Sequence, residues 1–312
     1  LLSELGDLDI DHKLPDKMPG KDEPYLQDSE EYDIPNKDDI TIRMVHMHRA
    51  GIFDLSNQDI TDNAQSHDKP YVNKNYLAFV EESEPEHQFT FDELFGVISE
   101  NRQVGFEGEP GSQYKYSDTG YCLLALIIER VTGKSYEEFI TEEFIVPNSL
   151  DDTTLPWRGD DTALPDPFVK GLLWTDNQIQ DVTISNMSPY VGNGNIITTP
   201  TDLARWCERL FTGTAGVSLP TVQMMMEGEP VREGSTSTYG LGILYSEDTG
   251  YGHGGAHPGY LTQMYYKPIN GLYYVILSNV WNCENCTDGS QSLEEELATI
   301  VEIGNEIFER MG

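Results

Sequence analysis

Two short blocks of the 312-residue sequence carry side chains of the kinds that hydrolytic enzymes use. The first is Tyr116-Ser117-Asp118, and the second is His253-Gly254-Gly255-Ala256. A tyrosine acts as a general base only when nearby cations drive its phenol, with an ordinary pKa of about 10, toward phenolate. Adjacent glycines let a substrate backbone lie close to the chain, and a main-chain N–H there can stabilise an oxyanion. Together the blocks predict two walls of one site.

Each block taken alone also has an ordinary structural explanation. Asp118 is a good N-cap for a helix over 119–132, with Tyr116 as a packing residue beside it. The glycines are typical of a hairpin turn, with His253 on the surface. The surrounding sequence must decide between these interpretations.

The periodicity of the sequence predicts an α+β fold: an antiparallel sheet flanked by helices, plus an all-helical subdomain. We expect one domain over 1–312, helix-rich at about 26–210, with the sheet and a C-terminal helix at about 211–312. Expected helices are 1–6, 41–48, 76–80, 91–98, 119–132, 135–144, 200–211 and 292–311. Expected strands are 239–245, 261–266 and 272–279, the last two joined as a hairpin around 268–271.

The charge of the chain limits its partners. There are 54 acidic residues against 19 basic ones, a net charge of −35, which argues against nucleic acid or an anionic membrane as a partner. Two explanations stay open: a highly soluble acidic protein, and adaptation to high salt. The longest apolar run, Cys122–Ile128, is too short to cross a bilayer.

The four cysteines predict no metal centre. Cys122 and Cys207 lie in helical patterns and are expected to be buried thiols. Cys283 and Cys286 form a C-x-x-C pair without a second pair or nearby histidines, so a local disulfide or two free thiols fit better than zinc. We expect no cofactor and no metal, and a small molecule or peptide as substrate.

The order of several stretches resembles the serine β-lactamase, DD-peptidase and esterase superfamily, in its class C β-lactamase-like, penicillin-binding-protein-like branch. The stretches that carry the resemblance are 1–14, 40–55, 110–121, 192–206, 239–243, 253–260 and 273–279. Each stretch is moderately specific, and their common order makes the resemblance strong. It implies a serine hydrolase that acts through an acyl-enzyme on a peptide, amide, ester or β-lactam bond. It also favours an extracytoplasmic location, although residues 1–312 begin without a signal peptide.

The resemblance also implies roles for individual residues. Tyr116 takes the position of the catalytic base, and His253 that of the Lys or His of the third family block. Gly255 and Ala256 line the substrate and oxyanion site together with Ser117, and the Ala256 N–H forms half of the oxyanion hole. Asp118 stands where most relatives have Asn, which weakens a β-lactamase assignment.

The family's nucleophile motif, Ser-x-x-Lys on one helical turn, has no convincing match. Ser66–Lys69 and Ser112–Lys115 fit the pattern by letter, but Pro70 disfavours a helix at the first, and a Pro-Gly turn precedes the second. We expect the motif upstream of Leu1, in a segment removed from this chain. The alternative is a member of the family that lost the motif and only binds its ligand.

Overall fold

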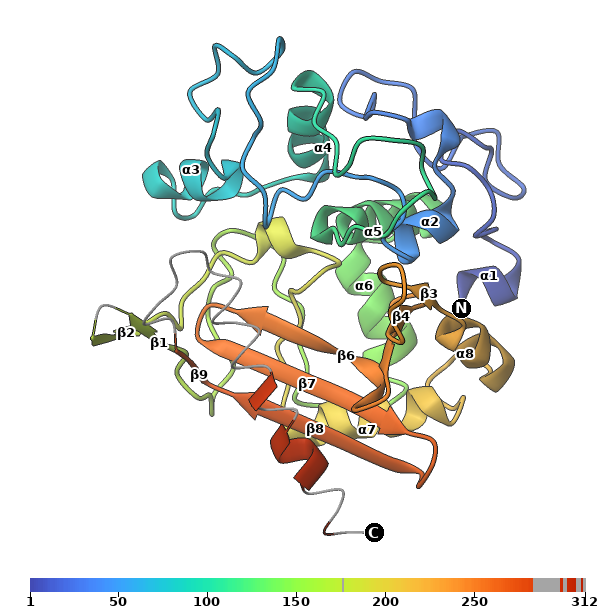
Figure 1. Ribbon diagram of the computed structural model, residues 1–312, viewed down its shortest axis with the longest axis vertical. Helices are drawn as coiled ribbons and strands as arrows, with labels where there is room; N and C mark the ends of the chain where they lie inside the picture. Colours follow the sequence, from blue (N-terminus) through green and yellow to red (C-terminus); the bar gives the residue numbers. More distant parts are fainter. Residues whose placement is uncertain (176, 283–297, 300–301, 307–309, 311–312) are drawn as a thin grey trace.

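The computed structural model describes residues 1–175, 177–282, 298–299, 302–306 and 310. Its helices are α1 (Leu2–Leu5), α2 (Ile42–His46), α3 (Tyr76–Ser83), α4 (Phe91–Glu100), α5 (Asp118–Thr132), α6 (Tyr136–Ile140), α7 (Pro200–Phe211) and α8 (Leu219–Met226). A π-helical turn, Thr141–Ile145, continues α6. Helices α1–α5 gather beside a sheet (Figure 1), and the mixed α+β architecture expected from the sequence is confirmed.

The larger sheet is antiparallel and has the strand order β3-β4-β5-β6-β7-β8. Its strands are β3 (Glu229–Pro230), β4 (Thr238–Tyr239), β5 (Leu244–Ser246), β6 (Gly250–His257), β7 (Tyr260–Lys267) and β8 (Leu272–Ser278). The pairing of Lys267 with Leu272 confirms the hairpin expected around 268–271. A smaller sheet has the order β2-β1-β9, from β1 (Leu172–Thr175), β2 (Gln178–Asp181) and β9 (Val280–Asn282).

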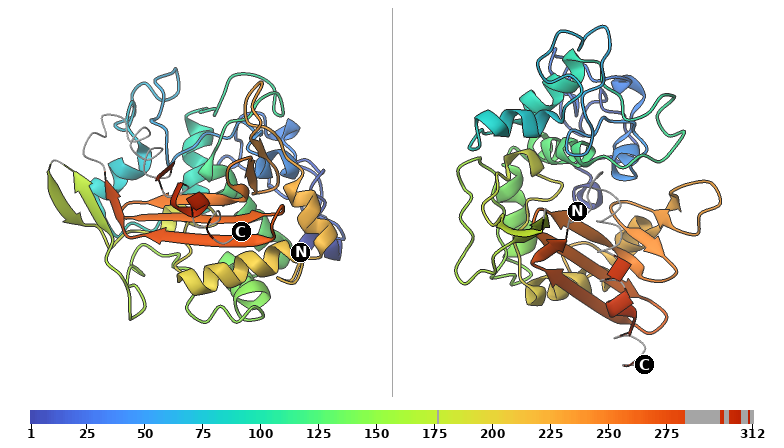
Figure 2. Two further views of the ribbon diagram at one scale, coloured as in Figure 1. Left: turned by 60° about the horizontal axis from the view of Figure 1, so that its bottom comes forward. Right: turned by 60° about the vertical axis from the view of Figure 1, so that its left-hand side comes forward.

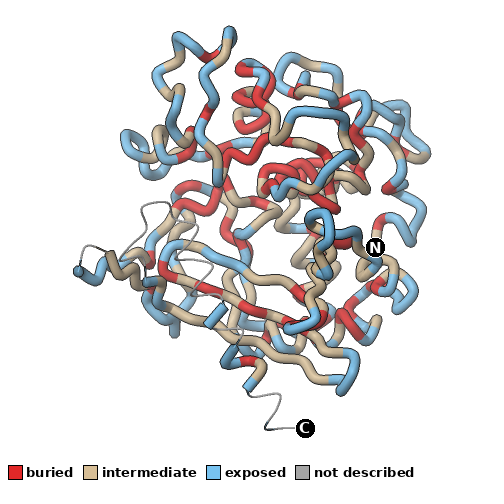
Figure 3. The backbone as a smooth tube through the Cα atoms, in the orientation of Figure 1, coloured by how far each residue is buried: buried red, intermediate tan, exposed pale blue. Residues whose placement is uncertain are grey.

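Helix α5 forms the centre of the helical part. The Ser117 hydroxyl accepts a hydrogen bond from the Gly120 N–H and so caps the helix, and Gly133 ends it with a left-handed φ of 72°. Leu123 and Ile127 are fully buried on its inner side. The buried residues concentrate around this helix and along the middle of the sheet (Figure 3). The cap is therefore Ser117, and Asp118 is the first residue of the helix.

Helix α7 covers one face of the sheet. Pro200 stands in its first turn behind the Thr199 cap. The ring of Phe211 stacks on Tyr266 at 5.0 Å between centroids, and Cys207 is fully buried. Figure 2 shows α7 running under β7 and β8. Cys122 and Cys207 are buried free thiols, as expected, whereas Cys283 and Cys286 lie outside the described residues.

One sequence-based expectation about strands was wrong, and one of the two interpretations of the second block is excluded. The segment 239–245 is not one strand, because β4 ends at Tyr239 and β5 begins at Leu244. Between them the chain turns back, with a left-handed φ of 77° at Gly242 and a hydrogen bond from Gly240 N–H to the Ile243 carbonyl. The block His253–Ala256 lies inside β6 and is not a turn. The expected start of the C-terminal helix falls outside the described residues, while 298–299, 302–306 and 310 are helical.

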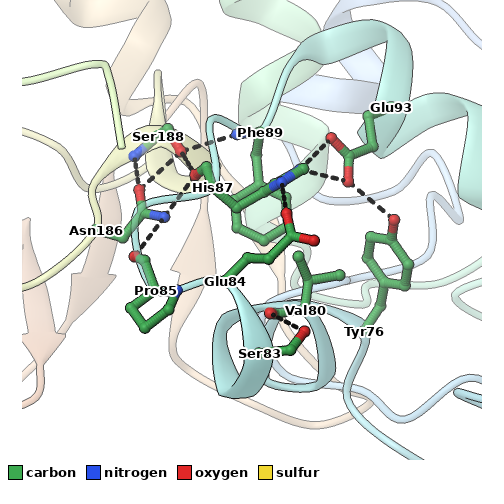
Figure 4. A network of polar contacts seen from close by, with 10 residues as sticks. All are labelled: Tyr76, Val80, Ser83, Glu84, Pro85, His87, Phe89, Glu93, Asn186 and Ser188. Carbon is green, nitrogen blue, oxygen red and sulfur yellow. Dashed lines mark hydrogen bonds and ion pairs between the residues drawn. The ribbon is translucent and has the colours of Figure 1, made fainter. Parts of the chain in front are cut away.

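A polar network around His87 ties the α3–α4 connection to residues 186–188 (Figure 4). The His87 ring contacts Glu84 through Nδ1 at 3.1 Å and Glu93 through Nε2 at 2.8 Å. The His87 carbonyl accepts hydrogen bonds from Asn186 at 2.7 Å and from the Ser188 hydroxyl at 3.2 Å. Burial lowers the pKa of His87, but the two carboxylates outweigh it and the net shift is upward. The polar network around His87 is therefore strongest when the His87 ring is an imidazolium.

Gly192 offers a test of how the loop after residue 190 packs on α5. Its φ is +93°, and a Cβ there would lie 2.6 Å from the Ala125 Cβ and 2.8 Å from the Tyr121 carbonyl. Gly192→Ala should lower the free energy of unfolding in urea by about 2–4 kcal/mol, from backbone strain and overpacking.

Gly194 is the matched control, because its added Cβ would meet nothing within 4 Å. Gly194→Ala should stay within about 0.5 kcal/mol of the parent protein. Equal losses in the two variants would contradict this packing.

Candidate active site

The two sequence blocks meet at the boundary between the helical part and the sheet. Tyr116 immediately precedes α5, and its ring centroid lies 6.2 Å from that of His253 on β6. The same Tyr116 ring lies 4.1 Å from the ring of His48. Tyr116 is 36% exposed, so one side of it faces solvent. Tyr116 and His253 therefore belong to one region of the surface.

His48 joins the two blocks by hydrogen bonds through both of its ring nitrogens. The Ser117 N–H donates to His48 Nδ1 at 3.1 Å, and His48 Nε2 lies 3.1 Å from the Tyr239 hydroxyl. That hydroxyl lies 3.0 Å from His253 Nε2, and His253 Nδ1 lies 2.5 Å from the Gly254 carbonyl. Burial lowers the pKa of His48 to about 3 and also lowers the pKa of His253. Both imidazoles are therefore neutral.

Sequence reasoning did not single out His48 or Tyr239. Both lie in stretches that carried the family resemblance, 40–55 and 239–243. The available signal was that His48 and Tyr239 are aromatic residues with polar atoms, each placed among apolar residues. The partners of His48 are 69 and 191 residues away in the sequence, so no local spacing indicated the contact.

Asp118 shares one amide partner with a second carboxylate, Asp54. The Asn57 side-chain nitrogen donates to Asp118 at 2.9 Å and to Asp54 at 3.0 Å. Burial, and then the charge of Asp54, raise the pKa of Asp118 to about 7. Burial also raises the pKa of Asp54, which is 2% exposed. Within the described residues no ion pair involves either carboxylate, and Asp54 and Asn57 were also missed from the sequence.

The phenol of Tyr116 is far from a phenolate in this environment. Burial, followed by the negative charge of Asp118, raises the pKa of Tyr116 well above its usual value. A general base needs the opposite shift. The base role therefore requires a cation close to both Tyr116 and Asp118.

The second wall of the site is the outer half of β6. Strand β5 pairs only with Gly250–Gly252, and β7 pairs with Tyr251–His257 on the other side of β6. Along His253–His257 the edge that faces away from β7 has no strand partner within the described residues. Gly255 and Ala256 are exposed there. An extended ligand can add to this edge by main-chain hydrogen bonds.

None of the three serines from the sequence analysis presents a nucleophile on a helix beside a lysine. Ser117 is 3% exposed and its hydroxyl caps α5, so its side chain is engaged in the helix cap. Ser66 is fully buried and donates to the Thr61 carbonyl at 2.6 Å, while Lys69 pairs with Glu100. Ser112 lies in a non-helical turn. Neither Ser-x-x-Lys match stands on a helix.

The described part of the chain contains neither a helix suited to crossing a membrane nor a cluster of three metal-binding side chains.

The chain belongs to the Beta-lactamase family, whose sequence model matches residues 1–288. Among curated relatives, Penicillin-binding protein 4* of Bacillus subtilis is 27% identical over 169 residues, covering 50% of this chain and 37% of that protein. A D-aminopeptidase of Brucella anthropi is 27% identical over 181 residues, covering 55% and 32%. The chain thus spans about a third of the length of these relatives.

Solved structures share the fold. A D-stereospecific amidohydrolase from Streptomyces has a TM-score of 0.71 at 22% identity, covering 89% of this chain and 77% of that one. A D-amino acid amidase from Ochrobactrum anthropi has a TM-score of 0.69 at 20% identity, covering 98% and 79%. A penicillin-binding protein from Bacillus halodurans has a TM-score of 0.67 at 16% identity, covering 96% and 80%.

The carboxylate pair predicts a pH dependence of stability. Asp118 has a raised pKa in the folded state, so its ionisation weakens folding at high pH, and this penalty disappears as the pH falls through about 7 toward the unfolded value. Asp118→Asn should remove the penalty and raise the melting temperature at pH 8 by about 3 °C or more, with little change at pH 4.

Asp160→Asn is the control, because it removes the same charge from an exposed loop position. It should shift the melting temperature by less than Asp118→Asn at pH 8. Equal shifts at the two positions would contradict the raised pKa of Asp118.

Proposed function

We propose that the protein is a serine hydrolase that forms an acyl-enzyme and cleaves the amide bond of a D-amino acid residue. The observation that carries the proposal is the meeting of Tyr116 with the open half of β6. Within the described residues, a phenol and a strand edge without a strand partner then flank the same surface. The family and its named D-aminopeptidase and D-amino acid amidase relatives support the substrate class. Ester and β-lactam bonds react by the same acyl transfer and are the other candidates.

The proposal requires a serine–lysine pair from outside residues 1–312, because Ser66 and Ser112 are unsuitable. A lysine ammonium placed between Tyr116 and Asp118 would lower the pKa of both groups. It would thereby offset the burial and the charge repulsion that raise the two pKa values in the described residues. The two carboxylates Asp54 and Asp118 form the negative environment that such a lysine needs.

The chemistry then follows in two transfers. Tyr116, as a phenolate stabilised by the lysine ammonium, takes the proton of the serine hydroxyl. The serine oxygen forms a bond to the carbonyl carbon of the substrate as the C=O π electrons move onto the carbonyl oxygen. The Ala256 N–H and the N–H of the nucleophile hold the resulting oxyanion. Tyr116 returns the proton to the leaving nitrogen as the C–N bond breaks. Water repeats the sequence on the acyl-enzyme and releases the acid.

Covalent labelling tests the proposal. The full-length gene product, including the sequence upstream of Leu1, should react with a fluorophosphonate, and mass spectrometry should place the adduct on the serine of a Ser-x-x-Lys motif. It should also hydrolyse D-alanine p-nitroanilide faster than the L-isomer. Residues 1–312 alone should give no adduct.

Absence of any adduct on the full-length protein would refute the serine hydrolase proposal. The alternative, a family member that only binds its ligand, would then remain. An adduct on Ser66 or Ser112 would overturn the assignment of the nucleophile.

Removing the Tyr116 hydroxyl tests the role of the base. In the full-length protein, Tyr116→Phe should lower kcat/KM by about 100-fold or more, because general-base catalysis contributes roughly that factor. The neighbouring Tyr114, whose ring lies 5.9 Å from His48, is the matched control. Tyr114→Phe should leave kcat/KM within about threefold, a small change on the same scale. Equal losses in both variants would remove the special role of Tyr116.

A further inference from the structure

One arrangement of protons satisfies all four hydrogen bonds of the chain that runs through His48, Tyr239 and His253. At one end stands the Ser117 N–H, which can only donate, so His48 Nδ1 must accept and carry no proton. A neutral His48 then has its proton on Nε2 and donates it to the Tyr239 oxygen at 3.1 Å. The one hydroxyl proton of Tyr239 is left for His253 Nε2 at 3.0 Å.

The opposite end of the chain fixes the same arrangement independently. The Gly254 carbonyl can only accept, so His253 Nδ1, 2.5 Å away, must carry the proton. That leaves His253 Nε2 as an acceptor, which agrees with the order derived from Ser117. Each of the four hydrogen bonds uses one proton, and an imidazolium at His48 would set its Nδ1–H against the Ser117 N–H.

The hydrogen-bonded chain is well shielded from water at His48 and Tyr239. His48 and Tyr239 are both 3% exposed. The His48 ring packs against Tyr239 at 4.7 Å, Tyr121 at 5.0 Å and Tyr116 at 4.1 Å. In this dry environment a lost partner leaves a buried polar group unsatisfied, which favours the complete chain over partial versions of it.

We propose that His48 and Tyr239 are positioning residues: they deliver a hydrogen bond to Nε2 of the Nδ1-protonated His253 and so set the separation of the Tyr116 wall from the β6 wall. His253 has both ring nitrogens engaged, so it offers no N–H to a substrate and no positive charge to Tyr116. The proton order stands without the proposed function, whereas its effect on catalysis rests on that function.

The tautomers can be read directly from the ¹⁵N spectra of the histidine rings. In protein labelled with ¹⁵N-histidine, His48 should show an unprotonated Nδ1 and a protonated Nε2, and His253 the reverse. Single substitutions assign the signals of these two among the seven histidines. A protonated Nδ1 on His48, or a protonated Nε2 on His253, would overturn the proposal.

Tyr239→Phe tests the link in the middle while keeping the aromatic ring. His253 should stay protonated at Nδ1, because the Gly254 carbonyl still accepts from it, but its Nε2 signal should shift because Nε2 loses the Tyr239 donor. His48 should likewise stay protonated at Nε2, because the Ser117 N–H still fixes Nδ1. Tyr251→Phe on β6, whose ring packs on Tyr245 at 4.6 Å, is the matched control and should leave both spectra unchanged. An unchanged His253 Nε2 signal in Tyr239→Phe would contradict the order.

Two replacements of His48 separate the two ends of its ring. Glutamine places an amide donor where Nε2 stood, whereas asparagine places an acceptor where Nδ1 stood. His48→Gln should therefore keep the His253 Nε2 signal of the parent protein, whereas His48→Asn, which leaves the Tyr239 oxygen without its donor, should shift that signal. The same outcome for both variants would show that His48 acts through bulk alone.

The effect on catalysis is measured separately in the full-length protein. Tyr239→Phe should lower kcat by about tenfold, with KM little changed. The reason is that a changed distance between the Tyr116 wall and the β6 wall weakens the stabilisation of the transition state. An unchanged kcat with a changed His253 spectrum would refute the positioning role and leave the proton order standing. An inactive parent protein refutes the proposed function and leaves the spectra interpretable.

Discussion

The arrangement of the site depends on one buried side chain, His48, which is hydrogen-bonded through both ring nitrogens. One nitrogen accepts from the Ser117 N–H at the start of α5, and the other donates to Tyr239 at the end of β4. The backbone at His48 takes a left-handed φ of 54°, and its carbonyl accepts from the Lys115 N–H at 2.8 Å. A non-glycine residue holds such a φ only when its surroundings compensate for it. This residue therefore joins α2, α5 and the sheet at one point.

The electrostatics of the site point toward a missing positive charge. Asp118 has a pKa of about 7, and the pKa of Tyr116 lies well above its ordinary value. Both shifts come first from burial and then from neighbouring negative groups. The net charge of the whole chain is −35, so the overall charge does not offset the negative groups of the site. A lysine in this position would reverse both shifts at once, and the neutral His253 cannot replace it.

Much of the fold followed from local signals in the sequence. Helix α5 has its apolar face, its Ser117 cap and Gly133 within one stretch, and the β7–β8 hairpin has Asn270-Gly271 at its turn. Choosing Asp118 as the cap was wrong by one residue, because serine and aspartate cap equally well. Two glycines in His253–Ala256 resembled a turn, but pairing with β7 keeps the segment extended.

The site was predictable only where whole motifs carried it. Tyr116 and His253 were expected to meet because their blocks occur in the family's order, and they do lie together. The contacts of His48 with Tyr239, and of Asn57 with Asp118, join residues that no periodicity relates. Such contacts are set by tertiary packing. Burial and neighbouring charges then shift the pKa values of these groups, and neither can be predicted from the sequence.

The central claim is that Tyr116 and the open half of β6 face the same bound substrate. A crystal structure of the full-length protein with a boronic acid analogue of a D-amino acid measures this most directly. We predict boron bonded to the serine of a Ser-x-x-Lys motif, one boronate oxygen within hydrogen-bonding distance of the Ala256 N–H, and another close to the Tyr116 hydroxyl. A boronate bound to Ser66 or Ser112, or seated away from both walls, would contradict the account.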